Sequence, residues 1–405
     1  MELKCAHQTY HWGRRGSEST VAQLAAAAQG LAVDEASPYA ELWMGTHPSG
    51  PSVLAKSGQQ LADWIRQNPS ALGEKVLQKF GQRLPYLFKV LSVNMALSIQ
   101  AHPSKEHAEE LHRARPDLYK DDNHKPEMAL ALTPFEALCG FRPLEQIQRF
   151  LTVVPELATV VGADAAGRLL AASPADPQAR CHLRDCFRAL MTREPAEVAR
   201  HVEALAARLR AQGDSPSQDV PSELLLRLNG QFPGDVGCFC ALFLNHLTLQ
   251  PGEALFLGPN EPHAYLLGDC VELMACSDNV VRAGLTPKFK DVPTLVDMLT
   301  YKCAPPEQQL FAPTGTEGPG VVLFDPPVPD FTLAKIQFRP VVPDTGYTLP
   351  TRDSASLLLV VSGSGRCGDA AVRRGTVLFV PAGEAVTLRL DSQHEVLMFQ
   401  AFCHL

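Results

Sequence analysis

Polar and apolar side chains alternate from Leu97 to His102, in the part of the sequence richest in potential chemistry. Successive side chains of a strand point to opposite faces, so Ser98, Gln100 and His102 share one face. Pro103 ends this strand, and Glu127 starts a second apolar run that we expect to return beside it. The amide oxygen of Gln100, the imidazole of His102 and the carboxylate of Glu127 can then meet at one cation. Such a mixed set suits zinc or another first-row divalent ion better than calcium or magnesium.

A further candidate ligand is His263, which follows the apolar stretch 252–257 and a Gly-Pro-Asn turn. We interpret this segment as a hairpin that holds His263 at its mouth. The pattern of Gly-Glu, apolar strand and Pro-His resembles that of small double-stranded β-helix barrels of the cupin kind, in which the histidine points inward to a metal. The alternatives are a hydrogen-bonded structural histidine and, for residues 97–102, the solvated face of a half-buried sheet.

The elements that must position these residues indicate a mainly β protein with two cupin-like (double-stranded β-helix or jelly-roll) barrels and an inserted α-helical domain. Helical spacing of apolar residues begins after Pro143 and includes amphipathic segments at 178–191 and 195–212. Strands are expected at 84–93, paired with the 97–102 strand, again over 237–257, and in the repeated strand-and-turn pattern after 321. The last of these units has no histidine in its Phe379-Val-Pro-Ala-Gly turn, which suggests a degenerate, metal-free barrel. We therefore expect four parts: 1–143, the N-terminal part of a catalytic cupin-like domain; 144–230, a helical insertion; 231–311, the remainder of the catalytic domain; and 312–405, a C-terminal degenerate cupin-like domain.

Composition limits the possible partners and compartments. At 405 residues the chain exceeds what one core supports comfortably. A formal net charge of -8 without any block of Lys and Arg argues against nucleic acid as a partner. There is no apolar run long enough for a membrane span, and the first residues lack the apolar core of a signal peptide. The 11 cysteines include no CxxC pair, which fits reduced thiols in the cytoplasm, and we expect a monomer.

Several motifs together resemble those of type I mannose-6-phosphate isomerase (phosphomannose isomerase), over the whole chain. They are Tyr10-x-Trp12-Gly13, Glu41-Leu42-Trp43-Met44-Gly45, the stretches 97–103 and 123–128, Phe135-x-x-Leu138-Cys139-Gly140-Phe141-Arg142, and Asp278-Asn279-x-x-Arg282-Ala283-Gly284-Leu285-Thr286-Pro287-Lys288. The resemblance implies a single zinc ion per chain, held by Gln100, His102, Glu127 and His263, and an active-site arginine at Arg282.

The family's reaction interconverts mannose 6-phosphate and fructose 6-phosphate through a cis-enediol or enediolate, feeding GDP-mannose synthesis for glycosylation and mannose catabolism. A base must move a proton between C2 and C1, and both Lys125 and Glu272 are candidates that the sequence alone does not separate. A lysine near a cation has its pKa lowered, which would suit Lys125. His124 is a weaker candidate for a part in ring opening.

The sequence contains no Gly-rich phosphate loop, so cationic side chains must anchor the phosphate. Arg282 and Lys288, together with Ser98, are the expected set. Arg282 could instead stabilise the charge of the enediolate, since a guanidinium group binds oxyanions in a fork.

Two other functions fit parts of the pattern. Two histidines and one carboxylate also form the facial triad of iron oxygenases, but a fourth ligand at Gln100 would occupy a position that oxygen activation needs. A metal-containing sugar-phosphate sensor would lack the base, whereas Lys125 and Glu272 are both present.

Overall fold

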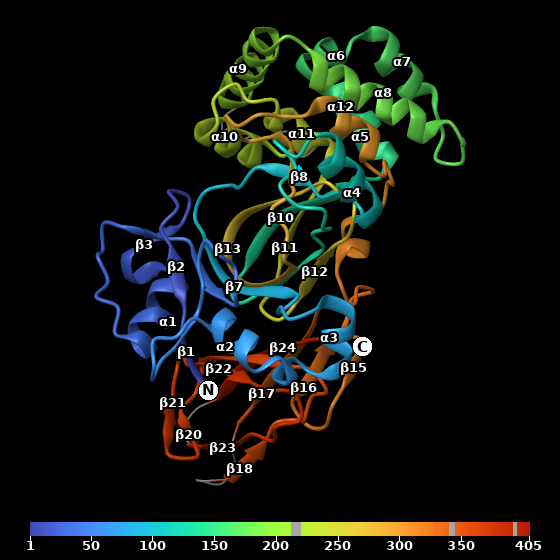
Figure 1. The fold of residues 1–405 in the computed structure, drawn as a ribbon. Coiled ribbons are helices and arrows are strands. Elements are labelled where there is room, and N and C mark those ends of the chain that lie inside the picture. The colour runs from blue at the N-terminus through green and yellow to red at the C-terminus, as the bar shows by residue number, and fades with distance from the viewer. Residues whose placement is uncertain (212–219, 340–344, 392–394) are drawn as a thin grey trace.

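The computed structural model describes residues 1–211, 220–339, 345–391 and 395–405. Figure 1 shows the helical insertion at one end of an elongated molecule, a sheet in the middle and the C-terminal sheet at the other end. Helix and strand make up similar shares, about 32% and 29%. The expected β framework with an inserted helical domain is therefore present, but the whole chain is more mixed than "mainly β".

The central sheet carries the candidate ligands. Its main path runs β11-β10-β13-β7-β5-β2, with β8, β9, β12 and β14 attached to it by antiparallel pairs. The strands are β2 (Ala6–Gln8), β5 (Glu41–Met44), β7 (Tyr86–Val93), β8 (Ile99–Ala101), β9 (Glu127–Ala131), β10 (Phe135–Phe141), β11 (Leu244–Leu249), β12 (Ala254–Leu257), β13 (His263–Ala275) and β14 (Val281–Gly284). β3 (Arg14–Arg15) and β4 (Pro38–Tyr39) form a separate small ladder.

Three expected strand pairings are wrong, although the strands themselves are present. β7 pairs with β13 and β5 rather than with β8, since β7 and β8 lie one after the other along the long β13. β9 lies between β12 and β13, so it does not return beside β8, and β12 and β13 do not form a hairpin. Pro259 and Pro262 lack backbone N–H groups in the connecting segment, which disfavours a tight ladder there.

The helical insertion follows the predicted amphipathic spacing. Its helices are α5 (Leu144–Val153), α6 (Pro155–Val161), α7 (Ala163–Ala171), α8 (Ala179–Thr192), α9 (Pro195–Ala211) and α10 (Ser222–Gln231). Gln212, the expected last residue of one helix, lies outside the described residues. The apolar faces of these helices share one core with residues of β8, β10 and β14, so the insertion packs directly on the end of the sheet that bears the candidate ligands.

One segment after the insertion differs from the expectation. Gly237–Phe243, expected as a strand, is the helix α11, and every one of its residues is buried. An apolar run of this length that is buried all round has no periodicity to separate helix from strand. Strand structure resumes only at β11. All 11 cysteines are free, as expected.

Further helices cover the central and C-terminal sheets: α1 (Thr20–Gln29), α2 (Leu61–Gln67), α3 (Glu74–Phe80), α4 (Lys105–Ala114) and α12 (Val292–Met298). Short 3-10 helices are η1 (Gly16–Glu18), η2 (Pro69–Leu72) and η3 (Pro306–Gln309). None of the helices in the described ranges is both long and apolar enough to cross a membrane.

The C-terminal region is built from strands, as expected. One sheet has the order β15-β16-β17-β24-β19-β22-β1-β6, and a smaller one the order β18-β23-β20-β21. Their strands are β1 (Glu2–Lys4), β6 (Val53–Leu54), β15 (Gly315–Thr316), β16 (Val321–Phe324), β17 (Thr332–Phe338), β18 (Thr345–Thr348), β19 (Ser356–Ser362), β20 (Gly365–Cys367), β21 (Ala370–Val372), β22 (Val377–Val380), β23 (Thr387–Leu390) and β24 (Val396–Phe402). The N-terminal β1 thus belongs to the C-terminal sheet, and the N-terminus lies beside it in Figure 1.

Candidate metal centre

Strand register brings His263, Gln100 and Arg282 together at the start of β13. His263, the first residue of β13, pairs with Gln100 of β8, and Arg282 of β14 pairs with Gln100 from the other side. Glu127 begins β9 and pairs with Met274, near the far end of β13. Glu127 also pairs with Leu257 of β12, and the 258–262 segment leads from there to His263, whose side chain contacts that of Glu127.

The nitrogen and oxygen atoms of three residues converge on one point. The Nε2 atoms of His102 and His263 lie 3.4 and 3.3 Å from the two carboxylate oxygens of Glu127. One ligand atom from each residue lies within 4.8 Å of the others, and all three side chains are buried. Two imidazoles and one carboxylate form a set that binds zinc in many proteins.

Hydrogen bonds on the far side of both rings fix the tautomers. Nδ1 of His102 lies 2.7 Å from the carbonyl oxygen of Asn279, and Nδ1 of His263 lies 2.9 Å from that of Glu261. A carbonyl only accepts, so both Nδ1 atoms carry the proton and both Nε2 atoms present a lone pair to Glu127. Nε2 of His263 has no hydrogen-bond partner although it is buried. Lone pairs that face an ionised carboxylate need a cation between them, so these residues fit a bound metal ion.

Gln100 lies beside this cluster with its amide turned the other way. Its Nε2 is 3.5 Å from Nε2 of His102, and its Oε1 accepts a hydrogen bond from the Ser98 hydroxyl at 3.0 Å. A half-turn of the amide exchanges the two atoms and would direct the oxygen toward the cluster. The structure thus places Gln100 next to the other three residues and leaves its amide oxygen bonded to Ser98.

The electrostatics of the cluster keep the glutamate ionised and favour a neutral imidazole. Burial alone would raise the pKa of Glu127, but positive charge beside it, from His102 when that imidazole is protonated and from Lys125, holds this pKa well below its ordinary value. Burial lowers the pKa of His102 more than Glu127 raises it. Neutral histidine and ionised glutamate are the protonation states in which both residues bind metals.

Both candidate bases line the same small chamber as Gln100, Glu127 and His263, which has a volume of about 100 Å³. Nζ of Lys125 lies 3.6 Å from Glu127, as the spacing of the two residues suggested. Glu272 reaches the chamber from β13, and burial raises its pKa. His124 instead pairs with Asp330 at 3.0 Å and is absent from the lining of this chamber.

Two charged residues of the chamber were missed in the sequence. Nζ of Lys89 lies 3.2 Å from Glu41 and 3.1 Å from Glu272, and all three side chains are buried. The two carboxylates raise the pKa of Lys89 beyond the loss that burial causes, so the amine stays charged. Trp43 donates its indole N–H to Glu41 at 2.6 Å and lies under the Lys89 ammonium. The available signal was the charge itself, since Lys89 interrupts the apolar strand β7 and Glu41 begins the apolar strand β5.

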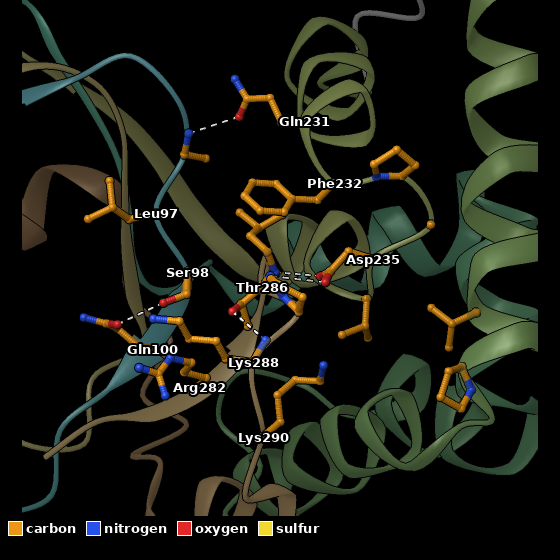
Figure 2. A pocket seen from close by; sticks show the side chains of 18 of the residues that line it. Leu97, Ser98, Gln100, Gln231, Phe232, Asp235, Arg282, Thr286, Lys288 and Lys290 are labelled. Atoms are coloured by element: carbon orange, nitrogen blue, oxygen red, sulfur yellow. Dashed lines mark hydrogen bonds between the residues drawn. The ribbon is translucent and has the colours of Figure 1, made fainter. Parts of the chain in front are cut away.

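A wider cleft of about 800 Å³ opens from this chamber, and the two share Leu97, Ser98 and Gln100. Arg282 and Lys288 line the cleft near Ser98, together with Lys290 (Figure 2). Burial lowers the pKa of the Arg282 guanidinium. Residues of the helical insertion, among them Gln231, also line the cleft, and so does Trp12 of the N-terminal region. The three expected anchors therefore face one space beside the metal cluster.

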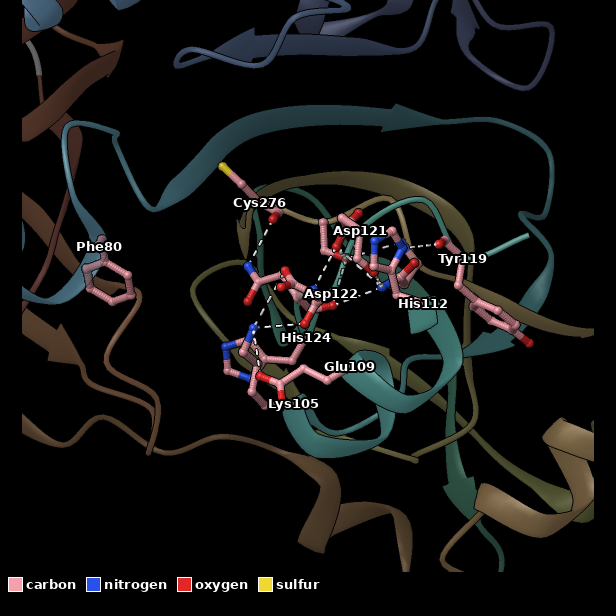
Figure 3. A network of polar contacts seen from close by, with 12 residues as sticks. Phe80, Lys105, Glu109, His112, Tyr119, Asp121, Asp122, His124 and Cys276 are labelled. Carbon is pink, nitrogen blue, oxygen red and sulfur yellow. Dashed lines mark hydrogen bonds and ion pairs between the residues drawn. The ribbon is translucent and has the colours of Figure 1, made fainter. Parts of the chain in front are cut away.

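A polar network around Asp121 (Figure 3) supports the Asn279 segment, whose carbonyl oxygen contacts the ring of His102. The Asp121 carboxylate accepts hydrogen bonds from the Ser277 hydroxyl at 2.7 Å and from the backbone N–H of Asp278 at 2.8 Å. The Asn279 side chain donates to the carbonyl oxygens of Asp121 and Asn123 at 2.7 and 3.0 Å. These bonds lock the 277–279 segment to the 121–123 loop, so the acceptor for Nδ1 of His102 is held in place.

Fold and site together define a metal-binding protein of mixed α and β structure, in which a buried two-histidine, one-glutamate set opens into a cationic cleft. Residues 1–144 match the family "Phosphomannose isomerase type I, catalytic domain", and residues 160–244 match its helical insertion domain. The chain is 51% identical to the mannose-6-phosphate isomerase of Bos taurus and 49% identical to that of Homo sapiens, and each alignment covers 99% of this chain and 98% of the relative.

Solved structures agree with these sequence matches. A mannose 6-phosphate isomerase bound with zinc and yttrium superposes with a TM-score of 0.84 at 31% identity, and the apo form from Salmonella typhimurium with 0.83 at 31%; each covers 100% of this chain and 99% of the other. The chain belongs to the type I phosphomannose isomerase family.

Proposed function

We propose that this chain is a zinc-dependent aldose–ketose isomerase that interconverts D-mannose 6-phosphate and D-fructose 6-phosphate. The observation that carries the proposal is the buried set of His102, Glu127 and His263 beside a cationic cleft, in a chain about half identical to mannose-6-phosphate isomerases over its full length. A sugar phosphate has polar hydroxyls at one end and an anion at the other, and the small chamber and the cleft offer matching partners for both ends.

Gln100 is proposed as the fourth metal ligand, after the half-turn of its amide. Its oxygen would leave Ser98 and turn toward the cluster, and the Ser98 hydroxyl would be free to bind substrate. When bound, zinc supplies a Lewis acid that stabilises negative charge on a substrate oxygen at C1 or C2. Four protein ligands would also leave less room for the open positions that an iron oxygenase needs.

The base that moves the proton between C2 and C1 is proposed to be either Lys125 or Glu272. Glu272 has the advantage of a pKa raised by burial, which brings a carboxylate closer to neutral pH. Lys125 has the advantage of position, since its ammonium contacts the ligand Glu127. Lys89 is proposed to keep Glu272 ionised and in place, since it forms an ion pair with that carboxylate.

The phosphate is proposed to bind in the cleft between Arg282, Lys288 and Ser98. Arg282 lies next to Gln100 in the strand register, so it is also near enough to the metal cluster to stabilise the enediolate. Lys288 is exposed and lies farther along the same loop, which suits an anchor for the end of the substrate remote from the metal.

The wider organisation is proposed as follows. The β regions form two cupin-like barrels, with boundaries at 1–143 and 231–311 for the catalytic one and 312–405 for the degenerate one, and 144–230 forms the insertion. The protein acts as a cytoplasmic monomer, and its product serves GDP-mannose synthesis or mannose catabolism.

A coupled assay from mannose 6-phosphate to fructose 6-phosphate tests the proposal. Activity that a chelator removes and zinc restores would support both the reaction and the metal. Activity that persists after a chelator has stripped the metal would remove the metal from the chemistry. A zinc-loaded protein with no isomerase activity that still binds sugar phosphate would favour a sensor instead.

A further inference from the structure

The segment that joins α10, the last helix of the insertion, to α11 contacts the cationic loop of the cleft through the side chain of Asp235. The match to the family's helical insertion domain, residues 160–244, includes this segment. Asp235 lies between α10 and α11 and lines the cleft. Its Oδ1 accepts a hydrogen bond from the backbone N–H of Leu285 at 2.6 Å, and its Oδ2 accepts one from Thr286 at 3.2 Å. Figure 2 shows these bonds between the insertion and the loop that carries Lys288.

This loop needs an external partner because its backbone is strained. Leu285 has a φ of +52°, a left-handed conformation that a branched side chain rarely adopts. The conformation turns two successive N–H groups toward the carboxylate. The Thr286 hydroxyl then accepts from the backbone N–H of Lys288 at 3.1 Å, so the bonds to Asp235 are relayed along the chain to Lys288.

Close backbone contact at two glycines leaves little freedom at this junction. A Cβ at Gly284 would lie 2.5 Å from the Cα atom of Gly237, and a Cβ at Gly237 would lie 2.5 Å from the nitrogen of Leu285. Asp235 also accepts from the backbone N–H of Gly237 at 2.6 Å, which ties the start of α11 to the same carboxylate. The strand of Arg282 and the start of α11 are therefore held in one register.

The segment that precedes Ser98 has a similar contact, with the last residue of α10. Oε1 of Gln231, at the end of α10, accepts a hydrogen bond from the backbone N–H of Ala96 at 3.0 Å (Figure 2). Ala96 precedes Leu97 and Ser98, which lead into β8. This part of the chain thus contacts both segments that carry expected anchors, the one that leads to Ser98 and the one that carries Lys288.

We propose that Asp235 is a positioning residue for the phosphate anchor, through which the helical insertion holds Lys288 and Arg282 at their places in the cleft. The inference rests on the proposed function, since it assigns the anchored anion to the phosphate of the substrate. Asp235 does not bind the substrate: its oxygens are directed at backbone N–H groups, and a carboxylate would repel a phosphate.

The substitution Asp235→Asn tests this role with the same side-chain shape. An asparagine keeps one oxygen acceptor, but its amide N–H₂ group would face a backbone N–H where the second oxygen accepts now. We expect the KM for mannose 6-phosphate to rise about tenfold while kcat changes less than about threefold, because the lost interaction concerns binding of the remote phosphate. The inhibition constant of inorganic phosphate should rise in parallel, and the zinc content should stay the same.

The matched control is Glu156→Gln, which removes the charge and one of the two acceptors that Glu156 offers to Arg208 between α6 and α9, each at 2.8 Å, and neither residue lines the cleft. This variant loosens the insertion without touching the loop, so KM and the phosphate inhibition constant should stay at their wild-type values. An effect of general loosening would instead appear in both variants.

Unchanged KM and unchanged phosphate inhibition in Asp235→Asn would overturn the proposal. So would a lower KM, which would mean that the carboxylate only repels the substrate. If the wild-type chain lacks isomerase activity, the proposed function fails, and calorimetric titration of the zinc-loaded full chain with inorganic phosphate then decides the positioning role: about tenfold weaker binding to Asp235→Asn supports it, and equal binding refutes it.

Discussion

Replacing Lys89 by methionine would remove the one ammonium group that contacts both Glu41 and Glu272. The three side chains are buried, and Nζ lies 3.2 and 3.1 Å from the two carboxylates. Methionine fills a similar volume, so the main effect is electrostatic: two buried carboxylates lose their shared cation. Removing one partner of a buried ion pair costs about 3–5 kcal/mol of folding free energy, and we expect a loss of this size at pH 8.

The loss should depend on pH in a direction that the structure fixes. Burial already raises the pKa of Glu272 above its ordinary value, and Lys89 opposes this rise. Without Lys89 the folded-state pKa rises further, so the folded state holds a proton that the unfolded state releases. The free energy of unfolding of Lys89→Met then falls as the pH increases through this folded-state pKa. Below the ordinary carboxylate pKa, where Glu272 is protonated in both states, this loss is absent. The difference between wild type and Lys89→Met should therefore be largest at pH 8 and smaller near pH 5.

Urea unfolding of both proteins at several pH values between 5 and 8 measures this difference. Chelator is present throughout, because His102 and Glu127 would otherwise add a pH-dependent loss of metal. Lys89→Arg retains the charge and serves as one control. Lys105→Met, at a partly exposed ion pair with Glu109, is the other and should cost at most about 1 kcal/mol. A free-energy difference that is the same at pH 5 and pH 8, or a variant as stable as wild type at pH 8, would refute this account of the buried cluster.

Three further predictions concern the site. His263→Ala should bind substoichiometric zinc and lose turnover, as metal analysis after dialysis would reveal; full zinc content would contradict its assignment as a ligand. Arg282→Ala should keep its zinc and its melting temperature but lose a factor on the order of 10² to 10³ in kcat/KM, and an unchanged rate in the coupled assay would exclude a catalytic part. The base can be identified from the exchange of the C2 hydrogen of mannose 6-phosphate with solvent deuterium. This exchange should stop in Lys125→Met if Lys125 is the base and in Glu272→Gln if Glu272 is the base. Exchange that continues in both variants would require a different residue.

The alternation in residues 97–102 was a reliable guide because a strand has a fixed side-chain period. Gln100 and His102 do share a face, and His263 and Glu127 do reach it. The pairing of the strands was not predictable to the same extent. β7 and β8 follow each other in sequence, yet both lie along β13, and only the long-range ladder decides this.

Lys89 and Glu41 show a second limit. Each is an isolated charge in an apolar strand, and a sequence gives no sign of where its partner lies. Their partner Glu272 is brought beside Lys89 by the register of β7 and β13. The prediction of a strand at Gly237–Phe243, which is the helix α11, failed for a different reason. Complete burial leaves no polar face, and without one the period of the apolar residues cannot be recognised.

The charges of the small chamber connect these missed residues to the proposed reaction. Glu41, Glu127 and Glu272 contribute three carboxylates, and Lys89 and Lys125 contribute two ammonium groups. With neutral imidazoles, the chamber without a cation has an excess of one negative charge, which would oppose an enediolate. A divalent ion changes this to an excess of one positive charge. Above the raised pKa of Glu272, loss of Lys89 would leave the metal-loaded chamber neutral, and the stabilisation of the enediolate would fall even with every metal ligand in place. Below that pKa, a proton on Glu272 would restore the single positive charge at the expense of the ionised carboxylate. Lys89 therefore belongs to the electrostatics of the site as much as the ligands do, although it contacts none of them.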